Sequence, residues 1–148
     1  RAAALTKDAL AWVERAGFAW SAAMIVGSLA AVAREQGDDA RAASLYRDSL
    51  RRVWAQRDRR NLASALFGFA LTVANSGRLE SAAQLCGAAE ALFASDATSL
   101  PIIGRPDRRR VVALLRARLG TERFAALQAV GQNLSPEEAL TLAEGIEF

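Results

Sequence analysis

An internal repeat with a period of 40 residues constrains the fold of this chain more than any other feature of its sequence. Residues 37–45 align with residues 77–85, and the small residues that precede each segment share the same register. A weaker third copy follows 43 residues after the second, beginning at Gly120. Self-similarity at a fixed period of about 20–50 residues is typical of stacked supersecondary units, each of which buries its apolar face against a neighbour.

Each unit places a glycine between two alanine-rich stretches. Gly37 and Gly77 predict the left-handed residue that ends one helix and a tight turn into the next. The Ala-Ala pairs at 42–43 and 82–83 place small residues where two antiparallel helices can approach closely. The chain has three prolines in 148 residues, and its sequence has no strand–helix alternation of the kind that builds nucleotide-binding folds. The sequence therefore predicts an all-α fold.

We expect eight helices in one domain. The expected units are a half repeat at 1–16, a first repeat at 18–55, a second at 59–95, a degenerate repeat at 107–132 and a terminal capping helix at 135–146. The segment 95–106 is the clear loop, because it holds two prolines and a glycine. Ser135, Pro136 and Glu138 form a strong helix-start signal. Because the chain opens within a helical pattern and without an initiator Met, we expect it to be a fragment of a larger protein.

Two sets of positions carry a resemblance to a known repeat. They are Leu29, Ala30, Ala33, Gly37, Ala42, Tyr46 and Ser49, and in the copy Phe69, Ala70, Val73, Gly77, Ala82, Cys86 and Ala89. Their spacing resembles the tetratricopeptide repeat, whose usual period is about 34 residues. We expect the excess length in the 56–60 connection, and the usual helix-ending proline is missing from both copies. The resemblance implies a right-handed α–α superhelix, a solenoid that ends in the capping helix.

A narrower resemblance covers residues 18–146. The segments that carry it are 37–42, 45–47, 58–60, 80–92, 119–124 and 134–139. They resemble the carboxy-terminal helical-repeat region of large bacterial transcriptional regulators of the LuxR and signal-transduction-ATPase type, with a departure at 101–110. The resemblance implies a cytoplasmic, non-enzymatic interaction and sensor domain that regulates a DNA-binding domain elsewhere in the full-length chain. The alternatives are a stand-alone peptide-binding or scaffolding adaptor and a direct nucleic-acid binder.

The residue inventory argues against catalysis and metal binding in this fragment. The sequence has no histidine, one cysteine (Cys86), and neither a GxxxxGK[ST] nor a GxGxxG motif. Cys86 falls at a helical position where a small buried hydrophobic residue fits. The adjacent carboxylates at 38–39 and 137–138 point about 100° apart on a helix and suit helix N-termini better than acid–base chemistry. We therefore expect no enzyme activity, no metal and no cofactor.

Charge and hydropathy narrow the choice of partners. All basic residues but Lys7 are arginines, and two clusters, at 51–60 and 105–118, could contact phosphates. Neither cluster matches a DNA-reading motif and the net charge is only +3, so we expect solvated or salt-bridged arginines and no direct nucleic-acid contact. The uncharged runs 16–33 and 61–77 consist mainly of small residues, which predicts buried helices and no membrane contact. Trp12, Trp20 and Trp54 are expected to pack between repeats.

The expected binding surface is the inner face formed by the first helix of each pair. The candidate groove residues are Met24, Gly27, Ala31, Arg34, Ser64, Phe67, Leu71 and Asn75. Tetratricopeptide domains that grip a terminal carboxylate carry lysine and asparagine at the places that Gly27, Ala31, Phe67 and Leu71 occupy here. We therefore expect an apolar groove for a hydrophobic protein or peptide segment, including one from the same regulator. The alternative is that Met24, Phe67 and Leu71 pack together as core and close the groove.

Overall fold

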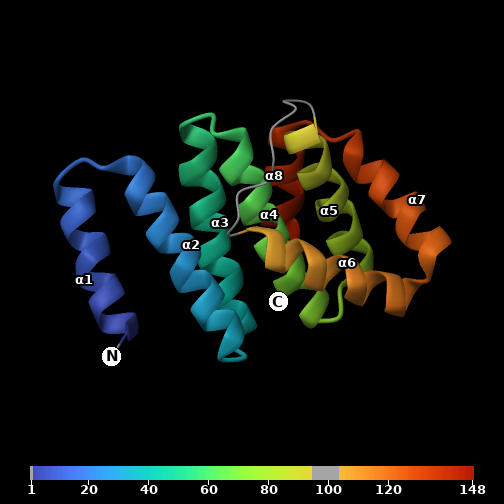
Figure 1. Ribbon diagram of the computed structural model, residues 1–148, viewed down its shortest axis with the longest axis horizontal. Coiled ribbons are helices and arrows are strands. Elements are labelled where there is room, and N and C mark those ends of the chain that lie inside the picture. The colour runs from blue at the N-terminus through green and yellow to red at the C-terminus, as the bar shows by residue number, and fades with distance from the viewer. Residues whose placement is uncertain (1, 95–103) are drawn as a thin grey trace.

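The computed structural model describes residues 2–94 and 104–148, and these residues fold into eight α-helices without a strand (Figure 1). The helices are α1 (Ala2–Arg15), α2 (Ala19–Glu35), α3 (Asp39–Ala55), α4 (Arg59–Asn75), α5 (Leu79–Ala94), α6 (Arg105–Leu119), α7 (Thr121–Gln132) and α8 (Pro136–Gly145). The predicted all-α fold is confirmed for this part of the chain. Most of the predicted loop at 95–106 lies outside the described residues, but Arg105 and Pro106 already belong to α6.

A left-handed residue recurs every twenty positions through the first five helices. Gly17, Gly37, Arg57 and Gly77 have φ angles of 78°, 80°, 55° and 91°. After each of them, the next amide donates a hydrogen bond to the carbonyl five positions back, as in a Schellman motif. The prediction that the 56–60 connection holds the extra residues is wrong. α3 ends at residue 55 and α4 begins at 59, so this connection is as long as those between α2 and α3 and between α4 and α5. The additional residues lie in the helices, since α2, α3 and α4 each have 17 residues.

Consecutive helices from α2 to α5 pack side by side, α2 on α3, α3 on α4 and α4 on α5 (Figure 1). Alanines occupy these contacts and are fully buried. They include Ala23, Ala30, Ala42, Ala43, Ala63, Ala70, Ala82 and Ala83. Larger side chains fill the centre, where α4 contributes Leu62, Leu66, Phe67 and Phe69 to the core. The predicted small-residue contacts are therefore present, and α4 is the most enclosed of these helices.

The last three helices depart from this order. α6 packs chiefly on α4 and α7 chiefly on α5, so the two helices of the expected degenerate repeat contact each other little. Gly87 of α5 and Gly131 of α7 lie where these two helices cross in close contact. A Cβ atom on Gly87 would collide with the Gln128 carbonyl, and one on Gly131 would collide with the Gln84 carbonyl. Glycine at both positions thus lets the two backbones touch.

Helix α8 was expected to cap the end of the helical array. It lies instead against α3 and α5. The end opposite α1 is formed by α7 (Figure 1). Arg47 of α3 holds the end of α8 against α3, because its Nε donates to the Ala143 carbonyl at 2.9 Å and its Nη2 to the Ile146 carbonyl. The start of α8 is as predicted, since the Ser135 hydroxyl and the Glu138 carboxylate form a reciprocal capping box. Within residues 2–94 and 104–148, no helix has the length and apolar character needed to span a membrane.

Candidate ligand pocket between α2 and α4

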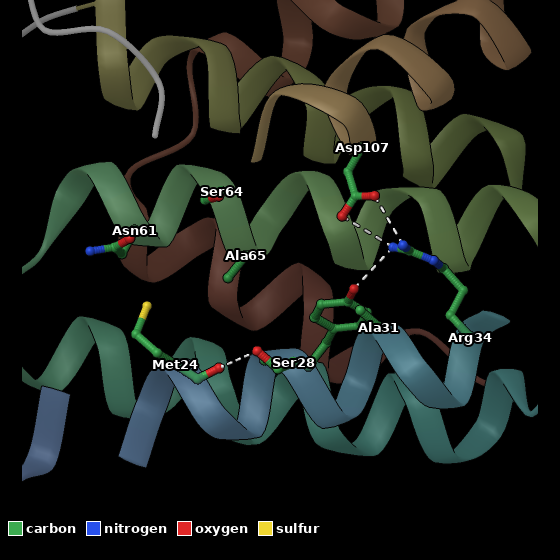
Figure 2. Close-up of a pocket in the computed structure, with 10 residues that line it drawn as sticks. Met24, Ser28, Ala31, Arg34, Asn61, Ser64, Ala65 and Asp107 are labelled. Atoms are coloured by element: carbon green, nitrogen blue, oxygen red, sulfur yellow. Dashed lines mark hydrogen bonds and ion pairs between the residues drawn. The ribbon is translucent and has the colours of Figure 1, made fainter. Parts of the chain in front are cut away.

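A pocket of about 280 Å³ opens between α2 and α4 (Figure 2). α3 lies behind both helices and Asp107 of α6 bounds one end. The lining residues are Met24, Gly27, Ser28, Ala31 and Arg34 of α2, Tyr46 of α3, Asn61, Ser64 and Ala65 of α4, and Asp107 of α6. Four helices therefore contribute to one concave site, and α6 enters it from far along the sequence.

The pocket exists because small residues face each other across the two helices. On α2 the lining positions follow helical spacing from Met24 to Arg34, so they share one face. Gly27 and Ala31 on that face, and Ala65 on α4, have too little volume to fill the gap. α2 and α4 themselves make few contacts, because α3 packs against both of them. The space is thus bounded by packed helices on three sides.

Arg34 forms the charged end of the pocket. Its side chain is buried, and Nη2 lies 2.9 Å from Asp107 Oδ1 while Nη1 lies 3.2 Å from Oδ2. Nη1 also donates to the Tyr46 hydroxyl at 2.9 Å, and Nη2 pairs with Glu35 at 3.3 Å. Burial alone would lower the pKa of Arg34, but Tyr46, Asp107 and Glu35 together raise it above its ordinary value. The guanidinium therefore stays charged and is neutralised by acidic neighbours.

Tyr46 places a phenol hydroxyl at the floor of the pocket. Burial raises the pKa of Tyr46 well above its ordinary value, so the phenol is neutral. Its ring packs directly on the backbone of Gly68, where a Cβ atom would come within 2.6 Å of the ring. The Tyr46 oxygen accepts a hydrogen bond from Arg34, and none of the described residues accepts the hydroxyl hydrogen. That hydrogen remains for donation into the pocket.

The polar groups of α4 lie at the opposite wall. Asn61 donates its amide to Asp58 Oδ2 at 2.5 Å, and its side-chain carbonyl oxygen has no donor among the described residues. The Ser64 hydroxyl likewise has no hydrogen-bond partner within residues 2–94 and 104–148, although the Gly104 backbone lies against it. By contrast, Ser28 donates to the Met24 carbonyl at 3.0 Å (Figure 2). The unsatisfied polar atoms thus belong to α4 and α3.

The structure divides the eight groove residues predicted from sequence. Met24, Gly27, Ala31, Arg34 and Ser64 come together in the pocket. Three others lie elsewhere. Phe67 and Leu71 are buried in the core at 0% and 2% exposure, and Asn75 is exposed at the end of α4.

Sequence reasoning missed five residues of the pocket. Ser28, Asn61 and Ala65 follow from helical spacing, because they lie one turn or one residue from Met24 or Ser64. Tyr46 and Asp107 reach the site only through tertiary packing, for which the sequence carries no local signal.

Ion pairs with acids involve Arg51, Arg52 and Arg57 of the first cluster and Arg108 and Arg110 of the second. Those of the first cluster bond Glu144, Glu14, Asp48 and Glu137, and those of the second bond Glu90 and Glu35. Cys86 is buried, which raises its thiol pKa. Trp12 and Trp20 are 58% and 55% exposed, so their expected packing between repeats is wrong, whereas Trp54 packs against the core. No group of acidic, cysteine or histidine side chains able to hold a metal ion occurs among the described residues.

Comparisons with protein-family models, with curated proteins and with solved structures found no match to this chain. Its function is therefore inferred from the pocket and from the sequence pattern.

Proposed function

We propose that this chain is a non-enzymatic interaction and sensor domain of a bacterial transcriptional regulator. In this role it regulates a DNA-binding domain located elsewhere in the full-length protein and works in the cytoplasm. Its partner is a protein or peptide segment, including other domains of the same regulator. The proposal includes a tetratricopeptide-like, right-handed superhelix, which the side-by-side helices and the recurring left-handed turns support.

The observation that carries the proposal is the ion pair of Arg34 and Asp107 at the end of the pocket. It joins residues 73 positions apart and links α2 to α6 at one end of an open cavity. A molecule in that cavity contacts groups that also hold α6 in place. Such an arrangement suits a sensor, because occupancy and helix docking share the same side chains. The transcriptional role in this proposal comes from the resemblance of residues 18–146 to the helical-repeat region of bacterial regulators.

The pocket's own chemistry supports a binding role over catalysis. Arg34 and Asp107 satisfy each other, and Tyr46 is a neutral phenol. Among the lining residues, no nucleophile lies beside a free base that could activate it. The remaining lining groups are hydroxyls, an amide and methyl-bearing side chains, which can bind and orient a ligand.

The test uses the full-length protein in its bacterial host. One strain carries the intact gene and a second carries the same gene without the codons for residues 1–148, with protein levels matched by immunoblotting. We expect the deletion to change the transcript levels of genes whose promoters the full-length protein occupies. If the full-length protein occupies no promoter and the deletion alters no transcript, the proposal is wrong and the stand-alone adaptor is favoured.

A further inference from the structure

The volume of the pocket sets the size of what it can hold. It measures about 280 Å³. An apolar cavity of about 150 Å³ accommodates one benzene molecule. By that scale this pocket has room for about ten to twelve non-hydrogen atoms. A molecule of this size is smaller than a peptide helix and is comparable to one aromatic ring with a short side chain.

The walls favour an apolar body. Met24, Gly27, Ala31 and Ala65 line the pocket with carbon and sulfur atoms. A methionine side chain is flexible and polarisable, so it adapts to the shape of an apolar ligand. The Met24 side chain reaches from α2 toward α4 across the cavity, as Figure 2 shows. The apolar part of a ligand would therefore lie between Met24 and Ala65.

The charged end of the pocket does not favour an ion. Arg34 is held by both oxygens of Asp107 and by Glu35, so an anion would have to displace a carboxylate to reach it. Asp107 is in turn engaged by Arg34, so a cation finds no free carboxylate among the lining residues. A buried ion without a counter-charge carries a large desolvation cost. An uncharged ligand avoids that cost.

Two hydroxyls remain for a ligand that carries an acceptor. Tyr46 keeps its hydrogen available, and Ser64 has no partner within the described residues. They lie on different helices and both border the cavity. A carbonyl or ether oxygen on the ligand would satisfy at least one of them.

We propose that this pocket binds a small, uncharged and mainly apolar molecule that carries one hydrogen-bond acceptor. This deepens the proposed function, on which it rests, by giving the chemical class of the molecule that the domain senses. The acceptor bonds the Tyr46 or Ser64 hydroxyl, and the apolar body packs between Met24 and Ala65. The intact Arg34–Asp107 pair closes one end of the occupied site.

The experiment uses Met24 as a reporter, because it is the single methionine in the sequence. The 148-residue chain is labelled with methyl-¹³C methionine, and the Met24 resonance is assigned with the variant Met24→Leu. Three probes of similar size are titrated separately: benzylacetone, which is neutral and has a ketone oxygen, hydrocinnamate, which is its anionic counterpart, and phenylpropylammonium, which is cationic. We expect a saturable shift with benzylacetone and binding at least about tenfold weaker for both ions.

Matched variants locate the binding. Ala31→Leu fills the cavity and should abolish the saturable shift, whereas Ala125→Leu, on the exposed face of α7, should leave it unchanged. Ser64→Ala removes one of the two candidate donors: binding of benzylacetone about three- to tenfold weaker assigns the bond to Ser64, and an unchanged affinity assigns it to Tyr46. Ser28→Ala should have little effect, because that hydroxyl already bonds the Met24 carbonyl.

Three results would overturn the proposal: no saturable shift with benzylacetone, tighter binding of either ion, or a shift that survives Ala31→Leu in a folded protein. The titration uses isolated protein, and the test of the proposed function uses promoter occupancy and transcripts. Failure of the titration with a normal transcript response would therefore reject the ligand class and leave the regulatory role standing.

Discussion

Arg34 of α2 and Asp107 of α6 form a bidentate ion pair, with Nη2–Oδ1 at 2.9 Å and Nη1–Oδ2 at 3.2 Å. The two residues are 73 positions apart in the sequence. The pair links α2 to α6 at the pocket, and an exposed pair of Arg110 with Glu35 links the same two helices outside it. Its arginine side chain is 4% exposed and its aspartate 17% exposed. Because the carboxylate retains some contact with water, the pair lies at the edge of the core and not at its centre.

Replacing Arg34 with methionine should destabilise the protein by about 2–4 kcal/mol, because it leaves Asp107 and the Tyr46 hydroxyl without their partner. The matched control is Arg110→Met. Arg110 pairs with the same Glu35 at 2.9 Å, but both side chains are more than half exposed. Its loss should cost less than about 1 kcal/mol. Urea denaturation of both variants measures the difference, and equal midpoints would contradict the structural role given to Arg34.

A side chain at either of the two left-handed turn glycines, Gly37 and Gly77, should lower the free energy of unfolding. Gly37→Ala and Gly77→Ala should each cost about 1 kcal/mol or more, because both glycines have positive φ angles. A Cβ atom meets no other atom within 4 Å at either site or at Gly145, which lacks a positive φ. Gly145→Ala should therefore be neutral or slightly stabilising. Thermal unfolding of the three variants isolates the backbone effect, and a loss at Gly145 equal to the others would refute it.

The crossing of α5 and α7 should be intolerant of even a methyl group. Gly87→Ala should destabilise by about 1–3 kcal/mol, since the new Cβ would meet the rigid backbone of α7. Gly27→Ala is the control, because its Cβ would lie 3.2 Å from Ser49 Oγ, a side-chain atom that can move. Hydrogen exchange should show faster amide exchange in α7 for Gly87→Ala only. Unchanged protection in α7 would mean that the crossing is looser than described.

The two core residues of α4 should behave differently from the pocket wall. Phe67→Ala should cost about 3–5 kcal/mol and Leu71→Ala about 2–5 kcal/mol, because both side chains are buried. Met24→Ala should cost less than about 1.5 kcal/mol, since that side chain borders an open cavity. Chemical denaturation separates these outcomes. Small losses at Phe67 and Leu71 would restore them to the binding surface predicted from sequence.

The capping box of α8 should contribute a pH-dependent part of the stability. Hydrogen bonds to the backbone and the side chain of Ser135 lower the pKa of Glu138 below its ordinary value. A depressed carboxyl pKa stabilises the fold above the unfolded-state pKa, and this contribution disappears as the pH falls through the folded-state value. Glu138→Gln should therefore lose less stability than the wild type between neutral and acidic pH. Parallel pH profiles for the two proteins would exclude this contribution.

The local structure could be predicted from the sequence with good accuracy. Each predicted unit begins and ends within two residues of a helix end in the structure. Glycine marked the turns at positions 37 and 77, and the capping signals at Ser135 marked the start of α8. The turn at Arg57 was misjudged because an arginine takes the left-handed conformation there, which hid the twenty-residue spacing of the helices. Local sequence signals therefore predict where the helices lie but only part of the twenty-residue spacing of the turns.

Tertiary arrangement was less accessible. The capping box of α8 reports where the helix begins and carries no information about the surface it packs on, which is formed by α3 and α5. For the pocket, the face of α2 was predictable from helical spacing. Tyr46 and Asp107 were not, because they meet Arg34 through packing between distant segments. The position of Phe67 in the core likewise depends on which neighbours surround α4.

The hydrogen bonds of Arg47 affect the order in which these helices can pack during synthesis. They join α3 to carbonyls 96 and 99 residues further along the chain. Helices α2 to α4 pack chiefly on their sequence neighbours, so they can assemble as they leave the ribosome, whereas the partners of Arg47 are synthesised after all of them. Until then the ring of Phe69 lacks the aromatic side chain of Phe148, whose ring centroid lies 6.1 Å from that of Phe69 in the folded chain. A ribosome that stalls within α8 would therefore present a nascent chain whose third helix is folded but still uncovered on one side.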